Sequence, residues 1–569
     1  MSSDVGAPVA GRPDPLPSPR AWAEEAWRAW WVVAAVVPLA MLTIFFAWPV
    51  VTLVGRGFVV DGRVDTGMFA EVFDQARTWR IVGTTLLLAA SGTAVSVALG
   101  LPGAYVLYVC RFPGRALVRA LVGVPFVLPT VVVGVAFLAL LGPSGPLAGL
   151  GQSRTAIVLA LVFFNYSVVV RTVGGLWSRL DPRMPQAARA LGASPWRAFR
   201  TVTLPALTPA LASAASLVFL FCASAFGIVM VLGGVRIGTI ETEIWYQTTQ
   251  LLDLGAAAAL SITQLVVVTL CLVVTNATTA RQERALRLRA DASGEQRFAW
   301  RRDALPGAVT ALVVLGLLGA PLVTLVVRSL RAGDGWSLEH YRALATTVGR
   351  ALPVPVWSGI RNSVVVAVEA TAIALALGVL VTLVVSRRPR TVLARRALRG
   401  LDALFMLPLG VSAVTVGFGF LITLNRPPLD LRSSMVLVPI AQAIVALPLV
   451  VRSMLPVVRA IDPRMREAAA ALGASPARVL RSVDLPFLAR GLGIAAGFAM
   501  AASLGEFGAT SFLARLDRPT LPVVIFRLIG RPGEASFGAA LAASVVLAGL
   551  TAAVMLLAEL ARPRAALPW

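Results

Sequence analysis

The sequence predicts an all-α integral membrane protein with about 12 transmembrane helices in two homologous six-helix halves, each with a helical loop on the cytoplasmic side. The first observation is composition: only 14% of the 569 residues are charged, against roughly a quarter in soluble domains. The second is a mean hydropathy of +0.81, which exceeds what a soluble core needs. The third is a segment of 22 residues that occurs twice.

Hydrophobic runs of about 20 residues, the length that crosses a bilayer, occur at twelve places. They lie near residues 30–54, 81–107, 117–142, 155–177, 209–233, 254–276, 306–327, 362–385, 400–424, 434–458, 489–514 and 536–558. Pro125, Pro129 and Pro408 interrupt two of these runs. Broken helices near the midplane of a transporter often line a binding site, although proline kinks without a ligand are also common.

The repeated segment reads QAARALGASPWRAFRTVTLPAL at residues 186–207 and EAAAALGASPARVLRSVDLPFL at residues 467–488, with 14 identities. An Asp-Pro pair precedes each copy and can cap and open a helix. Gly192 and Gly473 can take the left-handed conformation that ends a helix, and a Ser-Pro pair then starts a second one. Each copy therefore predicts a helix, a sharp corner and a helix, which we call an elbow. A Leu-Pro pair is expected to end each elbow before the next apolar run.

The repeat also sets the expected domains. Anchors such as Gly100 with Gly378, and Phe226 with Phe507, relate the halves with offsets that drift by only three residues. The expected segments are a disordered cytoplasmic tail (1–29), a first transmembrane helix with an outer loop (30–80), the first repeated domain (81–276), a cytoplasmic linker (277–304), a seventh helix with an outer loop (305–361), the second repeated domain (362–558) and a cytoplasmic tail (559–569).

The net charge of +23 follows membrane topology and needs no nucleic-acid partner. With the N-terminus inside, arginines on inner loops outnumber those on outer loops about two to one, which is the positive-inside pattern. Both termini and both elbows are then cytoplasmic. The basic loops are expected to set topology and to touch anionic lipid head groups.

The absence of lysine excludes several activities. All 51 basic residues are arginine, so no phosphate-binding loop with its lysine can exist and the chain does not hydrolyse ATP by that route. The single histidine, His340, has no second histidine near it, which argues against a metal site. Cys110, Cys222 and Cys271 are widely spaced and are interpreted as small apolar residues.

Polar residues inside the expected spans are candidates for the transport pathway. Glu506 and Glu369 either line a pathway or hydrogen-bond to a neighbouring helix, and Asn165 and Tyr166 either face the pathway or pack. The outer loop 233–253, with its three acidic residues, is either a docking surface for a soluble partner or a solvated loop.

The two elbows resemble the cytoplasmic loop signature of the membrane subunits of ATP-binding-cassette (ABC) importers of type I. That signature is an EAA triplet followed by Gly and then Leu-Pro. The second copy matches it fully, with Glu467, Ala468, Ala469, Gly473, Leu485 and Pro486. The first copy has Gln in place of Glu, with Gln186, Ala187, Ala188, Gly192, Leu204 and Pro205.

The resemblance implies a permease subunit in a bacterial inner or plasma membrane, without ATPase activity of its own. It would bind no cofactor, because ATP would sit on two copies of a separate ATPase subunit that receive the elbows as coupling helices. A soluble binding protein would deliver the solute from outside, and alternating access would move it inward. The residues implied in coupling are Gln186, Ala187, Ala188, Gly192, Ser194, Pro195, Arg197, Arg200, Glu467, Ala468, Ala469, Gly473, Ser475, Pro476, Arg478 and Arg481.

Two permease halves fused in one chain are similar to the iron(III) and thiamine importer permeases. The segments CASAFGIVMVLGG (222–234), TIETE (239–243) and SLGEFG (503–508) look most like that group, and the first leans toward the thiamine type. The substrate is left open between thiamine, ferric iron and another small solute such as a polyamine. The alternative is an ion-coupled secondary transporter of twelve spans, but it would be expected to show more embedded carboxylates or histidines and no duplicated elbow.

Overall fold

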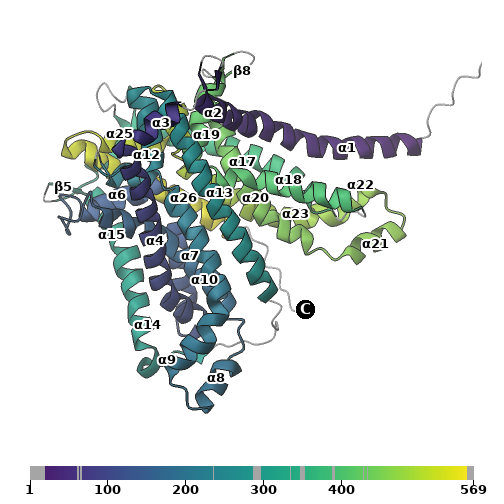
Figure 1. Ribbon diagram of the computed structural model, residues 1–569, viewed down its shortest axis with the longest axis horizontal. Coiled ribbons are helices and arrows are strands. Elements are labelled where there is room, and N and C mark those ends of the chain that lie inside the picture. The colour runs from purple at the N-terminus through teal and green to yellow at the C-terminus, as the bar shows by residue number, and fades with distance from the viewer. Residues whose placement is uncertain are drawn as a thin grey trace, which may run out of the picture.

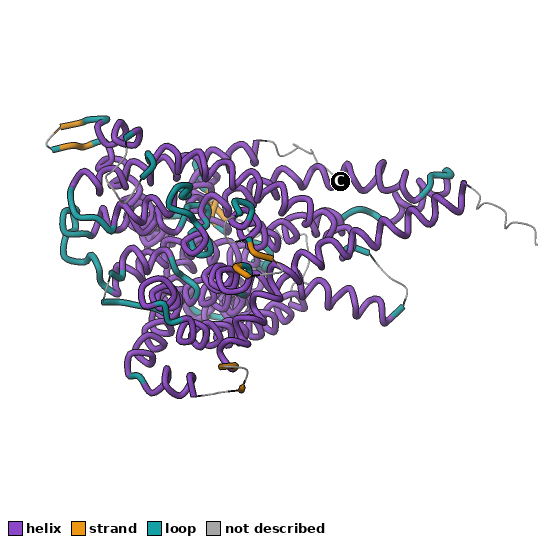
Figure 2. Tube along the Cα trace, turned by 90° about the horizontal axis from the view of Figure 1, so that it is seen from above, coloured by secondary structure: helices purple, strands orange, loops and turns teal. Residues whose placement is uncertain are grey.

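The computed structural model describes residues 19–560 except 61–62, 65–66, 235, 286–295, 334, 347–352, 388–390, 427–428 and 432–433. Helices make up most of the described chain, and strands occur there only as short pairs (Figure 2). The first half contains α4 (Ala76–Tyr108), α5 (Arg115–Gly123), η2 (Val124–Phe126), α6 (Thr130–Leu141), α7 (Arg154–Trp177), α8 (Arg183–Ala190), α9 (Pro195–Ala198), η3 (Phe199–Thr203), α10 (Leu204–Ala223), α11 (Gly227–Leu232), α12 (Ile240–Tyr246), η4 (Gln247–Leu251) and α13 (Leu254–Ala285).

The second half repeats this order with α17 (Val356–Val385), α18 (Val392–Gly410), α19 (Ala413–Thr423), α20 (Leu437–Arg459), α21 (Pro463–Ala471), α22 (Pro476–Val479), η7 (Leu480–Asp484), α23 (Leu485–Gly505), α24 (Thr510–Leu513), α25 (Leu521–Ile529) and α26 (Glu534–Leu560). Each half is preceded by one long leading segment. These are α1 (Pro19–Leu42), η1 (Thr43–Ala47) and α2 (Trp48–Phe58), and then α14 (Trp300–Leu312), η5 (Val313–Gly319) and α15 (Ala320–Ser329). Shorter elements are α3 (Gly67–Asp74), α16 (Glu339–Arg342) and η6 (Ala343–Ala345).

The strands form four pairs of two residues each. Three are antiparallel hairpins: β1 (Val59–Val60) with β2 (Arg63–Val64), β5 (Arg331–Ala332) with β6 (Gly335–Trp336), and β7 (Asn425–Arg426) with β8 (Leu429–Asp430). The fourth pairs β3 (Cys110–Arg111) in parallel with β4 (Gln296–Arg297).

The expected all-α membrane fold is confirmed, and the expected number of about 12 spans is the upper end of what the helices allow. In the described part of the chain, 9 helices are long and apolar enough to cross a membrane, and three bent pairs raise the number to as many as 12. The bend between residues 115–126 and 130–141 measures 103°, and it falls at Pro129, which has no N–H to continue the helix. The corresponding bend in the second half measures 90° and falls after α18. Pro408 lies inside α18, so the break comes a few residues later than expected, at Ser412.

Two expected spans end earlier than the hydropathy suggests. Residues 209–233 do not form one helix, because α10 stops at Ala223 and a separate short helix, α11, follows. The eleventh run, 489–514, divides in the same way into α23 and α24. The short helices pack against the bent third and ninth spans, α11 against α6 and α24 against α19. Hydropathy alone does not register this turn, since the residues on both sides of it are apolar.

Each leading segment packs against the half that it does not precede. The helix α1 lies along α17, and α2 packs against α19 while also touching α13 (Figure 1). In the same way α14 packs against α4, and α15 packs against α6 and α26. The exchange ties the halves together. The helix α1 begins at Pro19, inside the segment expected to be a disordered tail, while residues 1–18 lie outside the described chain. The other domain boundaries stay predictions.

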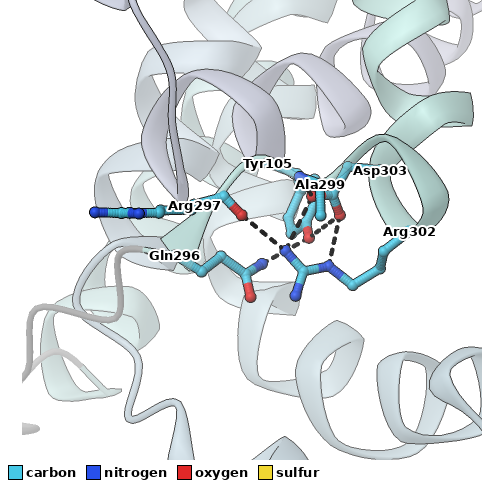
Figure 3. Close-up of polar contacts among 6 residues, drawn as sticks. All are labelled: Tyr105, Gln296, Arg297, Ala299, Arg302 and Asp303. Carbon is cyan, nitrogen blue, oxygen red and sulfur yellow. Dashed lines mark hydrogen bonds and ion pairs between the residues drawn. The ribbon is translucent and has the colours of Figure 1, made fainter.

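The linker between the halves is anchored to the first half. Its first part continues α13 to Ala285, residues 286–295 lie outside the described chain, and β4 then pairs with β3. Beside this pair the Tyr105 hydroxyl donates to Asp303 Oδ1 at 2.8 Å, and the Arg302 guanidinium donates to both carboxylate oxygens of Asp303 at 2.8 and 2.9 Å (Figure 3). The side-chain amide of Gln296 donates to the Tyr105 hydroxyl at 2.6 Å. The end of the linker is therefore fixed at the base of α4.

The two halves meet at one end and separate at the other. Figure 1 shows α6, α12, α19 and α25 gathered at one side of the molecule, with the elbows α8–α9 and α21–α22 at two well-separated far ends. Contacts of α12 with α19 and of α25 and α26 with α6 cross between the halves at the gathered end. The structure is therefore closed at the end away from the elbows.

A matched pair of glycine contacts shows that the repeat holds in three dimensions. A Cβ on Gly100 of α4 would lie 2.6 Å from Val169 of α7, and a Cβ on Gly378 of α17 would likewise collide with Val450 of α20. The partners occupy equivalent places in the two copies. Both helix pairs therefore approach too closely for any side chain larger than glycine.

We expect Gly100→Ala and Gly378→Ala to lower the free energy of unfolding by about 1 to 3 kcal/mol each, because an inserted methyl overpacks a tight helix contact. Thermal unfolding of the purified protein in detergent measures this. Gly83→Ala is the control on the same helix as Gly100, because a Cβ there meets no atom within 4 Å. A loss in Gly83→Ala equal to that in Gly100→Ala would contradict the interpretation.

Candidate functional site

Both elbows have the geometry that their sequences predict. Gly192 and Gly473 have φ of +87° and +82°, a left-handed conformation that favours glycine. The Ser194 hydroxyl accepts from the N–H of Arg197 at 3.2 Å, and the Ser475 hydroxyl accepts from the N–H of Arg478 at 3.4 Å. These serine caps begin α9 and α22 and fix the corner.

The acidic residues before the elbows also act as caps. Asp181 Oδ1 accepts from the N–H of Arg183, and Asp462 Oδ1 accepts from the N–H of Arg464, at 2.9 Å in both cases. In both copies the first helix of the elbow therefore starts at an aspartate that accepts a backbone N–H and ends at a left-handed glycine.

One expectation about the elbows is wrong. The Leu-Pro pairs do not end them, since a single 29-residue helix runs from Pro195 to Ala223, and the second elbow enters its span with a bend of 49°. Pro205 and Pro486 lie in the first turn of α10 and α23, where a missing N–H breaks little. A π-helical turn precedes each of them, η3 and η7, at equivalent positions. The second helix of each elbow therefore leads directly into a span.

The two elbows are braced differently. In the first, Trp177 and Phe199 stack with ring centroids 6.0 Å apart, and Phe199 also stacks on Trp196 at 5.5 Å. In the second, Arg466 Nε lies 2.8 Å from Asp484 Oδ1 in an ion pair. A cavity of about 620 Å³ lies beside the first elbow, between it and the anchored end of the linker. The duplication therefore keeps the backbone of the elbow and varies its support.

The outer surface of each elbow is exposed. Leu191 and Leu472 stand at equivalent corners, and each is 89% exposed. Most of the residues expected to couple are exposed with them: Gln186, Ala187, Gly192, Ser194, Pro195, Arg197, Arg200, Glu467, Ala468, Gly473, Ser475, Pro476, Arg478 and Arg481. Ala188 and Ala469 are half-buried. An exposed leucine surrounded by arginines is suited to contact with another protein.

A second set of residues closes the junction between the halves. Phe226 stacks on Phe507 with ring centroids 5.1 Å apart, and Trp245 meets the edge of Phe526 at 5.8 Å. Each residue here touches its own counterpart in the repeat, since both pairs are related by the offset of the elbows. A residue can touch its symmetry mate only close to the symmetry axis. The four rings therefore mark the axis that relates the halves, and Phe507 joins the pairs by packing on Phe526 at 5.3 Å.

Glu241 lies beside these rings, one helical turn before Trp245 on α12, and it is fully buried. Its Oε2 accepts from the hydroxyl of Ser412 in the second half at 2.5 Å, and its Oε1 accepts from Gln264 Nε2 at 2.9 Å. Gln264 Nε2 also donates to the carbonyl of Ala223 at the end of α10. A carboxylate of the first half is thus bonded across the junction to the second.

The expectation that the loop 233–253 is exposed is therefore wrong for Glu241 and Glu243. Glu243 is also buried, and it pairs with Arg77 at 3.0 Å and accepts from Gln247 at 2.9 Å, all within the first half. Asp253 instead caps the start of α13 by accepting from the N–H of Ala256. Sequence reasoning missed Glu241 as a junction residue because its partners Gln264 and Ser412 are distant in the chain. The segment TIETE did carry a signal, since it begins with a threonine that caps α12.

Glu506 has a different environment. Its Oε1 accepts from the N–H of Ala509 at 2.7 Å, and its Oε2 accepts from the N–H and hydroxyl of Thr510. Gln442 of α20 donates to the Thr510 hydroxyl at 3.2 Å and accepts from Ser503. These bonds all lie within the second half. The carboxylate satisfies the first N–H groups of α24 in an apolar setting.

The other expected pathway residues lie apart from the junction rings. Glu369 is exposed and lines a cavity of about 380 Å³ in the second half, together with Arg361, Asn362 and Asp517. Asn165 donates to the carbonyl of Leu161 at 2.9 Å and to Cys222 Sγ at 3.4 Å, inside the first half. Tyr166 is buried between α7 and α4, where it packs against Gly103. Their role in a pathway stays a prediction. Within the described residues no group of three or more His, Cys, Asp or Glu side chains is placed to hold a metal ion.

Residues 96–288 match the family described as binding-protein-dependent transport system inner membrane component. The matched segment is similar to the permeases of that family. The match covers the first elbow and the spans around it, and the duplication extends the same architecture to the second half. Permeases of this family are non-enzymatic membrane subunits of ABC importers. This confirms that the chain is an importer permease in the inner membrane with several spans, and that it is not an enzyme.

Several known proteins align with most of this chain. It is 26% identical over 520 residues to the thiamine transport system permease protein of Brucella abortus, covering 89% of this chain and 90% of the relative. It is 28% identical over 487 residues to the protein of that description from Escherichia coli, covering 81% and 85%. A probable ABC transporter permease of Sinorhizobium fredii is 28% identical over 530 residues, covering 87% and 90%. The fused two-half arrangement is thus shared along nearly the whole length.

We expect Glu506→Ala to destabilise the permease, because it leaves the N–H groups of Ala509 and Thr510 without an acceptor. The loss should be about 1 to 3 kcal/mol for each buried group, measured by thermal unfolding in detergent. Glu506→Gln keeps an acceptor oxygen and should lose less than half as much. Equal stability of the alanine variant and the unchanged protein would contradict the capping role.

Proposed function

We propose that this permease imports thiamine, delivered by an extracytoplasmic solute-binding protein and driven by two copies of a separate ABC ATPase subunit. The observation that carries the substrate is the set of relatives described as thiamine transport permeases, each matched over more than 80% of both chains. The segment 222–234, which leans toward the thiamine type in sequence, ends α10 and forms α11 at the junction of the halves.

The two elbows are the proposed sites of ATPase coupling. Two exposed corners of equal backbone geometry, each capped by serine and led into a span by a helix that is continuous in the first half and bent by 49° in the second, are suited to two copies of one partner. Because each elbow is the cytoplasmic end of a long helix, a displacement at the elbow is transmitted to the junction at the other end. When the ATPases draw the separated elbows together, the halves would rock and open the end that is now closed.

The remaining assignments follow from this orientation. Both termini and both elbows face the cytoplasm, in agreement with the excess of arginine on the loops at that side. Arginines at the inner ends of the spans touch anionic lipid head groups. ATP is bound by the partner subunits, and this chain holds no cofactor.

The test of the substrate is uptake of labelled thiamine and of labelled ferric iron, side by side, in the native host with and without the gene. We expect thiamine uptake alone to depend on the gene, and to return when the gene is restored on a plasmid. If iron uptake depends on it and thiamine uptake does not, the proposed substrate is wrong.

The test of coupling is Gly473→Val. At φ of +82° a side chain costs roughly 1 to 2 kcal/mol and should distort the corner, although the space around Gly473 is open. We expect the variant to reach the membrane at normal levels but to lose most uptake at unchanged or raised ATP hydrolysis. Gly473→Asn is the matched control and should retain most uptake, because asparagine tolerates this conformation. Full uptake by the valine variant would exclude a coupling role for the corner.

A further inference from the structure

We propose that Glu241, with the four aromatic rings on the axis, is the site in the opened pathway that binds an organic cation. This inference deepens the proposed function, because it requires that the permease opens along the axis between its halves. It names the charge class of the solute and the residues that select it.

The position of the rings supports a place on the pathway. Phe226 and Phe507 are symmetry mates in contact, as are Trp245 and Phe526, so the four rings occupy the axis itself. A solute that passes between two halves related by such an axis must pass these rings. They close the junction in this structure, with Phe226 and Phe507 6% and 2% exposed.

The partners of Glu241 are neutral, and one of them is supplied by the opposite half. In the described part of the chain Glu241 is bonded by Gln264 and Ser412 and forms no ion pair with an arginine. Glu243, two residues on, has Arg77 as its counter-charge. Separation of the halves would take the Ser412 hydroxyl away from Glu241 and leave a carboxylate that has no ion-pair partner among the described residues of this structure.

Two further polar groups at this place lack a partner. Gln264 is 1% exposed, and its Oε1 accepts no hydrogen bond although its Nε2 donates twice. The indole N–H of Trp245 is buried without an acceptor. A buried polar atom without a partner is uncommon and costs roughly 1 to 3 kcal/mol. A carboxylate and an amide oxygen beside aromatic faces form a set that suits a cation with hydrogen-bond donors.

The repeat supplies a contrast, because the charge exists in only one half. The counterparts of Glu241 and Gln264 in the second half are Pro522 and Val545, and the position of Ser412 before α19 is taken by Pro129 before α6. Aromatic rings occupy equivalent positions in both halves, whereas the carboxylate and the amide of the site come from the first half only. Thiamine carries a fixed positive charge and two aromatic rings, so it belongs to the class that this site would bind.

The test measures the charge preference of the open pathway without any assumption about the natural substrate. The three cysteines are replaced by alanine, and Phe226→Cys places one thiol on the axis. The assembled complex with its ATPase and binding protein, in proteoliposomes under ATP turnover, is treated with a trimethylammonium and with a sulfonate methanethiosulfonate reagent. A thiol on an exposed loop corrects for their intrinsic rates. We expect the cationic reagent to react faster by roughly tenfold, the factor that one nearby charge in a partly hydrated site supplies.

Three variants in this background identify the source of the preference. Glu241→Gln should reduce it to near unity. Glu243→Gln removes a buried carboxylate from the same helix and should keep it. Ser412→Ala leaves the charge and removes the bond across the junction together with the cap of α19, so it should keep the preference and raise the rates of both reagents. The proposal is overturned if Glu241→Gln keeps the preference, if Ser412→Ala abolishes it, or if Phe226→Cys never reacts during turnover.

Thiamine uptake by the cysteine-containing protein separates this proposal from the proposed function. If the unchanged complex imports thiamine, Glu241→Gln should raise the concentration for half-maximal uptake at least tenfold, and unaltered uptake kinetics would overturn the cation site. If the unchanged complex does not import thiamine, the substrate is wrong, and the reagent preference still decides the role of Glu241.

Discussion

The contact of four aromatic rings on the symmetry axis is the constraint on which the rest of the structure depends. Two helical halves of one duplicated sequence can join in many ways, but symmetry mates can touch only on the axis. The stacking of Phe226 on Phe507 and the edge contact of Trp245 with Phe526 therefore fix both the axis and the closed end of the junction. The arrangement of the elbows at the other end follows from this junction. Halves joined at one end by rings and by exchanged leading helices can separate at their elbows, and Figure 1 shows them separated there.

The membrane explains why this junction is built from short helices. A chain that turns at membrane depth must satisfy its N–H and C=O groups internally. The structure meets this need with side chains: Glu506 caps α24, Thr239 caps α12, and Ser412 caps α19. The Ser412 hydroxyl both accepts from the N–H of Val414 and donates to Glu241. One hydroxyl thus completes a helix end and joins the two halves.

Sequence reasoning reached the fold and the elbows because both depend on local signals. Apolar run length predicts spans, and the glycine and serine caps of the elbow act within a few residues of themselves. Sequence reasoning failed where the structure depends on tertiary contacts, because two stretches of equal hydropathy can differ only in the residues that they contact. The run 209–233 contains a turn that packing against α6 requires, and Glu241 is fully buried through partners that lie 23 and 171 residues away in sequence. The exchange of leading helices is equally invisible, since an apolar helix carries no mark of the half against which it packs.

Symmetry is retained where a repeated partner is proposed and lost where a single solute is proposed. The elbows keep the same backbone angles, caps, exposed leucine and π-helical turn, and they differ mainly in how they are braced beneath the surface. On the axis the opposite holds: the rings are kept in both halves, while the carboxylate, the amide and the hydroxyl that meet there come from unmatched positions. A second carboxylate at the equivalent position would lie close to the first when the junction closes, and the two like charges would repel each other there. Because the acceptors occur in only one half, the junction can close without two buried carboxylates in contact. It still presents one carboxylate when it opens.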